Sequence, residues 1–94
     1  MLYMVTARFK PGREAEHQAL TAQFGDHMRQ PLLHIRLVGA LKDDAGKRVG
    51  VHMLMEADSR QQLDDFLEQS PYKQAGLYKS IDIDVLEIEA GGLN

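Results

Sequence analysis

The chain has no cysteine, no long apolar run and no excess of positive charge. Without cysteine it cannot form a disulfide, a thiolate metal site or a cysteine nucleophile, and this fits a reducing cytoplasm. No apolar run approaches the roughly 18 residues that a membrane span needs. Met1–Phe9 lacks the charged segment and apolar stretch of a signal peptide. We therefore expect a cytoplasmic protein that does not associate with membranes.

Basic residues are too few and too scattered for a nucleic-acid surface. The chain has 11 Lys and Arg against 14 Asp and Glu, a net charge of −3, whereas nucleic-acid binding requires a clustered positive face. The eight glycines are dispersed, so no Gly-rich phosphate loop is present, and no Gly-x-Ser-x-Gly elbow occurs. Nothing in the sequence calls for a cofactor.

The length predicts one domain over residues 1–94. A chain of 94 residues buries only about 60–65% of the surface that it exposes when unfolded. With no disulfide available, oligomerisation is the common remaining way to bury more apolar surface.

Apolar periodicity and turn residues predict alternating strands and helices. A helix is expected from Arg13 to about Arg29, where Leu20, Phe24, His27 and Met28 form one apolar stripe. Pro31 allows it to end near Gln30 or to kink and continue to His34. A second helix begins after Asp58 or Ser59, one of which is its N-cap, and has Leu63, Phe66 and Leu67 on its buried side. The strands are expected at Leu2–Phe9, Ile35–Leu41, Arg48–Glu56 and Leu77–Glu89, followed by a loose tail at 91–94.

The order β-α-β-β-α-β is typical of an α+β, ferredoxin-like fold. Right-handed crossovers then place both helices on one face of a four-stranded antiparallel sheet. The strands nevertheless carry apolar residues on both alternating sets, as Val5 and Met4 show. A bare apolar sheet face usually marks a partner. We predict a homodimer, packed sheet to sheet or edge to edge into a barrel-like pair.

His27 is the histidine with the most direct route to chemistry. It shares the apolar stripe of the first helix, where partial desolvation would lower its pKa and keep the imidazole neutral. A neutral imidazole can act as a general base; the simpler interpretation is a border histidine with one hydrogen bond.

The other titratable residues point to structural or surface roles. His17, His27 and His34 are at least about 10 Å apart along a helix axis, because each residue rises ~1.5 Å, so they cannot share one metal ion and no metal site is predicted. Asp43 is assigned to a turn and Asp82 to a solvated strand face. Among the arginines, Arg36 and Arg48 could bind a small anion, although a surface role is the default.

The segment Ser70–Gly76, SPYKQAG, is typical of a capped turn, in which Ser70 caps, Pro71 occupies the first helical position and Gly76 allows the chain to leave. Together with LYMVTARF, the late helical His27, LVGAL and DDAGKRVG, the segment SPYKQAGLYKSIDI resembles the YciI-like (YCII-related) family. Pro71-Tyr72 with Ala75-Gly76-Leu77-Tyr78 is its most specific part. The resemblance covers nearly the whole chain and implies a dimeric α+β barrel.

The resemblance also implies a site. Members of the family carry a helix histidine and the aspartate of an Asp-Pro-Tyr/Phe motif, proposed to form a His–Asp dyad. These positions correspond to His27 and Ser70, so the carboxylate is replaced by a hydroxyl that supplies no charge. The family's Ala-Gly-Pro motif corresponds to Val38-Gly39-Ala40 and lacks the proline. We take Tyr72, Gly39 and Arg36 as candidate substrate-binding residues, and Asp82 or Asp43 as acids that could replace the missing one.

Two functions follow, with a weaker third. Some family members are similar to muconolactone-type lyases or dehydrochlorinases, which implies a lyase, isomerase or hydrolase acting on a small carbonyl or lactone compound with His27 as base. The alternative is a non-catalytic dimeric module that binds a small ligand or supports another protein. A cofactor-free oxygenase rests on fold analogy alone.

Overall fold

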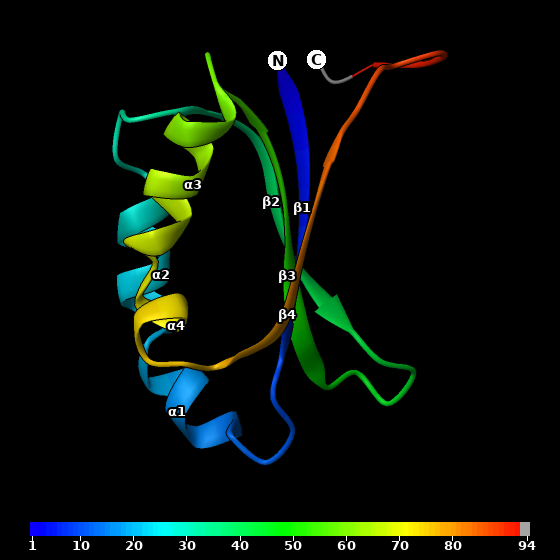
Figure 1. Cartoon of the computed structure of the whole chain (residues 1–94). Helices are drawn as coiled ribbons and strands as arrows, with labels where there is room; N and C mark the ends of the chain where they lie inside the picture. The colour runs from blue at the N-terminus through cyan, green and yellow to red at the C-terminus, as the bar shows by residue number, and fades with distance from the viewer. Residues whose placement is uncertain (93–94) are drawn as a thin grey trace.

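A computed structural model describes residues 1–92 and confirms the ferredoxin-like α+β fold. Four antiparallel strands form one sheet in the order β2-β3-β1-β4, and the helices lie together on one of its faces (Figure 1). The strands are β1 Leu2–Phe9, β2 His34–Lys42, β3 Arg48–Glu56 and β4 Tyr78–Val85. The helices are α1 Glu14–Ala19, α2 Thr21–Met28, α3 Arg60–Glu68 and α4 Pro71–Gln74.

The first predicted helix is interrupted at Leu20, so the expectation of one continuous helix was wrong. The His17 carbonyl accepts hydrogen bonds from Leu20 N (3.2 Å) and from Thr21 Oγ1 (3.0 Å). A threonine hydroxyl that bonds the carbonyl four residues earlier competes with the backbone and bends a helix. Most of the predicted stripe is buried despite the interruption. Phe24, His27 and Met28 are buried and Leu20 is partly buried, and His17, one period earlier on the same stripe, is buried too. α2 ends at Met28, ahead of Pro31.

The core fills the space between the helices and the covered face of the sheet. The inward-facing residues of the two central strands are almost fully buried, among them Val5, Ala7, Val51, Met53 and Met55. Residues of the helices and loops pack against these strand residues and complete the core, namely Phe24, Leu63, Phe66, Tyr72 and Leu77. β4 ends at Val85, earlier than the predicted Glu89, and Leu86 N bonds the Leu2 carbonyl. The predicted tail at 91–94 lies partly outside the described residues.

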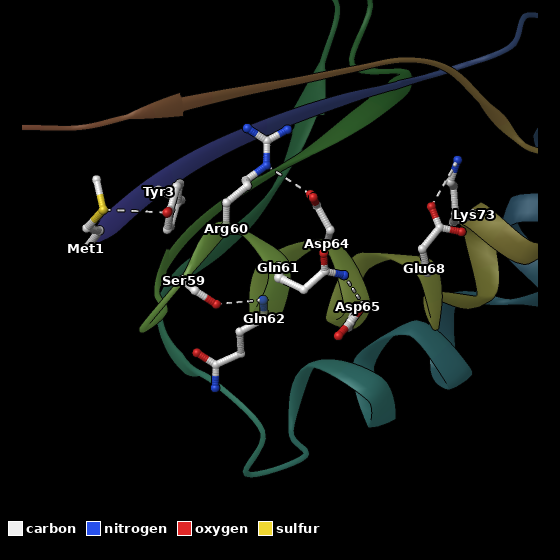
Figure 2. Close-up of polar contacts among 10 residues, drawn as sticks. All are labelled: Met1, Tyr3, Ser59, Arg60, Gln61, Gln62, Asp64, Asp65, Glu68 and Lys73. Carbon is white, nitrogen blue, oxygen red and sulfur yellow. Dashed lines mark hydrogen bonds and ion pairs between the residues drawn. The ribbon is translucent and has the colours of Figure 1, made fainter.

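Two serines precede helices, and only one of them caps. Ser59 Oγ accepts a hydrogen bond from Gln62 N at 3.1 Å and caps α3 (Figure 2). Ser70 stands before α4, but its side chain makes no capping hydrogen bond. The predicted capping role of Ser70 was therefore wrong, whereas Pro71 does begin α4 and Gly76 has the left-handed φ of +68°.

The uncovered face of the sheet carries apolar side chains beside polar ones. Leu54 and Met4 are paired neighbours on the two central strands, and Leu37 on β2 pairs with Leu54 and is 47% exposed. In the next row, Thr6 Oγ1 lies 3.2 Å from His52 Nδ1. The sequence-based expectation that apolar residues occupy both faces is thus met.

No helix among residues 1–92 combines the length and the apolar character that crossing a bilayer would require.

Candidate functional site

An aromatic cluster forms where α1, α2 and α4 approach the end of β1. The ring of Phe9 stacks on His17 with centroids 4.1 Å apart and meets Tyr72 edge-on at 5.0 Å. Tyr72 stacks on Phe24 at 4.6 Å, and Tyr78 lies 5.8 Å from Phe9. We call Phe9, His17, Phe24, Tyr72 and Tyr78 the aromatic cluster. It joins the Ser70–Gly76 segment to α1 and not only to the following strand.

Buried polar atoms without partners gather at this cluster. Within residues 1–92, four buried side-chain nitrogen or oxygen atoms make no hydrogen bond: His17 Nδ1, Arg48 Nε, Ser70 Oγ and Tyr78 Oη. Arg48 lies 5.8 Å from the ring centroid of Tyr72, and the Ser70 hydroxyl is close enough to Tyr78 to affect its pKa, although the pair lacks the geometry of a hydrogen bond. Native interiors rarely leave such atoms unpaired, and exceptions often have a functional cause. We call these four residues the unpaired quartet.

His17 is held in the neutral form. Its side chain is 3% exposed, and burial lowers its pKa first, with the positive charges of Arg48 and Lys47 acting in the same direction and Glu14 opposing them. A neutral imidazole keeps one nitrogen lone pair that can accept a proton. Because a base must be unprotonated to work, this environment suits a general base.

Tyr78 is held as a neutral phenol. Burial raises its pKa to about 12, and the charge of Arg48 only partly offsets that effect. A neutral phenol can donate a hydrogen bond to an anion. The quartet therefore offers one base, one cationic donor and two hydroxyl groups.

A hollow of about 150 Å³ opens beside His17. Its lining includes Phe9, His17 and Arg48, with Glu14 and Lys47 at its wall. Lys47 Nζ lies 2.5 Å from Glu14 Oε1, and this pairing lowers the pKa of Glu14 to about 2. Glu14 is thus a charged carboxylate beside His17, and its negative charge favours the protonated form of the imidazole.

His27 lies elsewhere, in contact with α3. It is 6% exposed, its ring stacks on Phe66 at 4.3 Å, and Nε2 is 2.8 Å from the Phe66 carbonyl oxygen. The Nε2–H therefore donates to that carbonyl. Among residues 1–92 no hydrogen bond connects His27 with Ser70. The role of His27 as a base stays a prediction, and its surroundings match the simpler interpretation of a structural histidine.

The candidate substrate-binding residues are separated. Tyr72 is fully buried, and its hydroxyl lies 3.2 Å from Thr21 Oγ1. Gly39 lines a second hollow, between α2 and β2, that also includes Arg48. Arg36 bonds Glu56 at 2.6 Å, at the opposite end of β3 from Arg48. Only Tyr72 and Gly39 lie near the quartet.

Of the two acids proposed as replacements, only Asp43 reaches the hollow beside His17. Asp82 pairs with Thr6 on the uncovered face of the sheet. The Asp43 carboxylate accepts hydrogen bonds from Ala45 N and Lys47 N and so forms the turn that was predicted. Glu14 is a second acid in that lining, and its charge acts to raise the pKa of His17; the sequence interpretation missed it. A signal existed, because Glu14 is three residues before His17 and such residues are neighbours on a helix.

No three His, Asp or Glu side chains in the described part of the chain converge as metal ligands do.

The comparisons with known proteins decide the family. The model of the YCII-related domain matches residues 1–87. The chain belongs to the YCII-related domain family. A search of curated proteins finds no match.

Solved structures of similar fold include TftG from Burkholderia phenoliruptrix AC1100, a 5-chloro-2-hydroxyhydroquinone dehydrochlorinase in complex with 2,5-dihydroxybenzoquinone. It is 21% identical, with 93% of this chain and 94% of that chain covered and a TM-score of 0.84. Rv0793 from Mycobacterium tuberculosis is 18% identical, with 97% and 100% covered and a TM-score of 0.60. A candidate antibiotic biosynthesis monooxygenase from Bacteroides thetaiotaomicron is 16% identical, with 100% and 93% covered and a TM-score of 0.61. At these identities the likeness establishes the fold alone.

In this YCII-related chain, Ser70, the serine of the motif segment, is buried at the aromatic cluster. Ser70 is 1% exposed, and its hydroxyl belongs to the unpaired quartet. The segment that resembles the family's Asp-Pro-Tyr motif is thus part of the cluster that contains His17. Of the two histidines on the predicted stripe, His17 is the one that packs in this cluster.

Proposed function

We propose that the chain is a lyase or isomerase of the YciI type that acts on a small anionic carbonyl or enol compound at the unpaired quartet. His17 is its general base. The single observation that supports this most strongly is that all four unpartnered buried polar atoms of the described chain lie at the aromatic cluster, and that two of their residues, His17 and Arg48, line one hollow.

Three members of the quartet have a task in this reaction. His17 accepts a proton from the carbon next to the substrate carbonyl, or from an enol hydroxyl that is conjugated with that carbonyl. The electron pair released moves toward the carbonyl oxygen, whose negative charge faces the guanidinium of Arg48 and the phenol of Tyr78. Elimination is completed when the electrons return and a leaving group departs with its bonding pair. Isomerisation is completed when the proton is returned to another atom.

Glu14 supports the base in part. A carboxylate near an imidazole stabilises the imidazolium that forms in the transition state. Glu14 exerts this effect on the pKa of His17, but it also pairs with Lys47. The ion pair connects the start of α1 to the β2–β3 hairpin and so closes one side of the hollow.

The test compares two histidines that share one apolar stripe. With 5-chloro-2-hydroxyhydroquinone and a panel of small lactones as substrates, we expect His17→Gln to lower kcat by about 10²–10⁴-fold, the usual contribution of a general base. His27→Gln is the matched control, because glutamine can still donate to the Phe66 carbonyl, and it should keep activity within about tenfold. If His27→Gln loses activity and His17→Gln retains it, the general base is His27 and not His17. Arg48→Gln should raise KM.

A non-catalytic ligand-binding module is the second candidate, and the observation that favours it is Ser70 in place of the family's aspartate. Its signature would be binding without turnover. If NMR titration with 2,5-dihydroxybenzoquinone shifts the His17 and Arg48 signals while none of the panel is converted, the module is supported and the lyase is rejected.

A homodimer is part of the proposal, as is a cytoplasmic location. The uncovered sheet face has Leu54, Met4 and the half-exposed Leu37 at its centre, and burying such a patch favours association. Light scattering after size exclusion should give about twice the chain mass of 10.6 kDa. Leu37→Asp should reduce it to the monomer mass. A natural chain that is monomeric at micromolar concentration would contradict the dimer.

A further inference from the structure

A second hollow shares Arg48 with the hollow beside His17. It has a volume of about 320 Å³ and lies between α2 and β2. Its lining is mostly apolar, with Arg29 and Arg48 as its charged residues; the apolar ones are Phe24, Gly25, Met28, Ile35, Val38 and Ala40. Volumes near 300 Å³ are in the range of small-molecule pockets, which are typically apolar with a few placed polar groups.

Arg48 connects the two hollows. It lines the hollow of His17 and also the hollow between α2 and β2. Thr21 lies at the same polar end, where its hydroxyl faces that of Tyr72. An anionic group that pairs with the Arg48 guanidinium therefore lies next to the hollow of His17 and also next to the apolar groove between α2 and β2.

Two of the residues that line the groove, Gly25 and Ala40, are small. Gly25 lies within α2, where a Cβ would come 3.2 Å from the guanidinium of Arg29. Ala40 pairs with Val51, so its methyl group is on the covered face of the sheet, and it is exposed there. Val38, on the same face of β2, is 40% exposed. Apolar side chains on the face that the helices cover are thus left in contact with solvent.

We propose that the hollow between α2 and β2 is the subsite for the apolar part of the ligand, so that the site selects small anions that carry an apolar arm. This rests on the function proposed above and specifies its substrate class. The anionic oxygen pairs with Arg48, the reactive carbon faces His17, and the arm lies against Phe24, Met28 and Val38.

The experiment measures binding and does not require turnover. Benzoate, 4-ethylbenzoate and 4-butylbenzoate are titrated into the protein and their Kd values are read from amide NMR shifts. Each methylene that is buried should tighten binding about fourfold. The butyl compound should therefore bind roughly tenfold tighter than the ethyl compound or more, with shifts at Phe24 and Val38.

Filling the groove should remove this gain. In Ala40→Leu the larger side chain occupies the space of the arm, so the three Kd values should converge while that of benzoate stays within about twofold. Val38→Phe serves as a second variant if Ala40→Leu does not fold. Ala22→Leu is the matched control, because it makes the same substitution at an exposed position of α2 that does not line the groove, and the gain per methylene should persist.

Three results would overturn the proposal: equal Kd values across the series, a gain that persists in both groove-filling variants, or no binding of any of the three carboxylates. Failure of the proposed catalysis is distinguishable. His17→Gln should keep the gain per methylene, so a protein that shows the gain but converts no substrate has the subsite without the lyase.

Discussion

Replacing Ser59 or Ser70 by alanine is expected to give two different results, although each serine directly precedes a helix. Ser59 Oγ accepts a hydrogen bond from Gln62 N, one of the donors that a helix start leaves unpaired (Figure 2). Ser70 Oγ is buried and accepts none. The pair therefore separates a serine that caps its helix from a buried serine that does not.

The magnitudes follow from those contacts. Loss of an N-cap side chain typically costs about 1 kcal/mol, which corresponds to a fall in Tm of about 4–8 °C for a domain of this size. Ser70→Ala removes a buried hydroxyl that has no partner, and such a group contributes no hydrogen bond and carries a desolvation cost of about 1–3 kcal/mol. We expect Ser70→Ala to be neutral or up to about 1 kcal/mol more stable.

Urea unfolding followed by circular dichroism measures both variants against the natural chain. The protein concentration is held fixed, since the stability of an oligomer depends on it, and the slope m should be unchanged so that midpoints compare directly. Binding of 2,5-dihydroxybenzoquinone is measured on the same samples. Ser70→Ala should weaken that binding, whereas Ser59→Ala should leave it intact.

The reasoning fails if Ser70→Ala loses as much stability as Ser59→Ala. That result would mean that the Ser70 hydroxyl bonds α4 or Tyr78 in solution. The quartet would then lose a member, and the argument for a ligand at this cluster would weaken accordingly.

Three further predictions concern the same cluster. Tyr72→Phe removes the bond to Thr21 and should cost about 1 kcal/mol; a double-mutant cycle with Thr21→Val that shows no coupling would contradict it. Phenolate absorbance should show Tyr78 ionising near pH 12, a step absent from Tyr78→Phe, whereas ionisation of every tyrosine near the ordinary value of about 10 would refute it. Because the pKa of folded His17 is lowered, the unfolded chain binds its proton first, so the free energy of unfolding should fall as pH drops below about 6.5. His17→Gln should flatten that slope.

The fold was predictable because its signals are local and repeat along the chain. A short run that is apolar on both alternating sets marked β1, and residues that share alternate faces marked β3. The predicted bounds of both strands match the structure, and turn residues marked the hairpin at 43–46. The order of strands and helices then left few topologies to consider. β4 was predicted too long because Leu86 and Ile88 continue its apolar character beyond the last paired residue, Val85.

The site was less predictable because it depends on contacts between distant segments. The family motif directed attention to Ser70 and Tyr72, and both lie at the cluster; their roles in binding or catalysis stay predictions. Arg48 had been recognised only as one of several arginines that could bind an anion. Nothing in the sequence around Arg48 shows that its guanidinium will lie over a ring 24 positions later in the chain, which is a consequence of tertiary packing alone.

The interruption at Leu20 explains why one apolar stripe carries two histidines with different surroundings. Thr21 Oγ1 donates a hydrogen bond to the His17 carbonyl, and the chain starts a new helix after Leu20. His17 remains on α1, against Phe9 and beside Arg48, whereas His27 on α2 donates to a carbonyl of α3. Both are buried, but only His17 has a buried ring nitrogen without a partner. The periodicity of the sequence identifies which histidines face the core. The chemistry of each histidine depends on the atoms that surround its ring there.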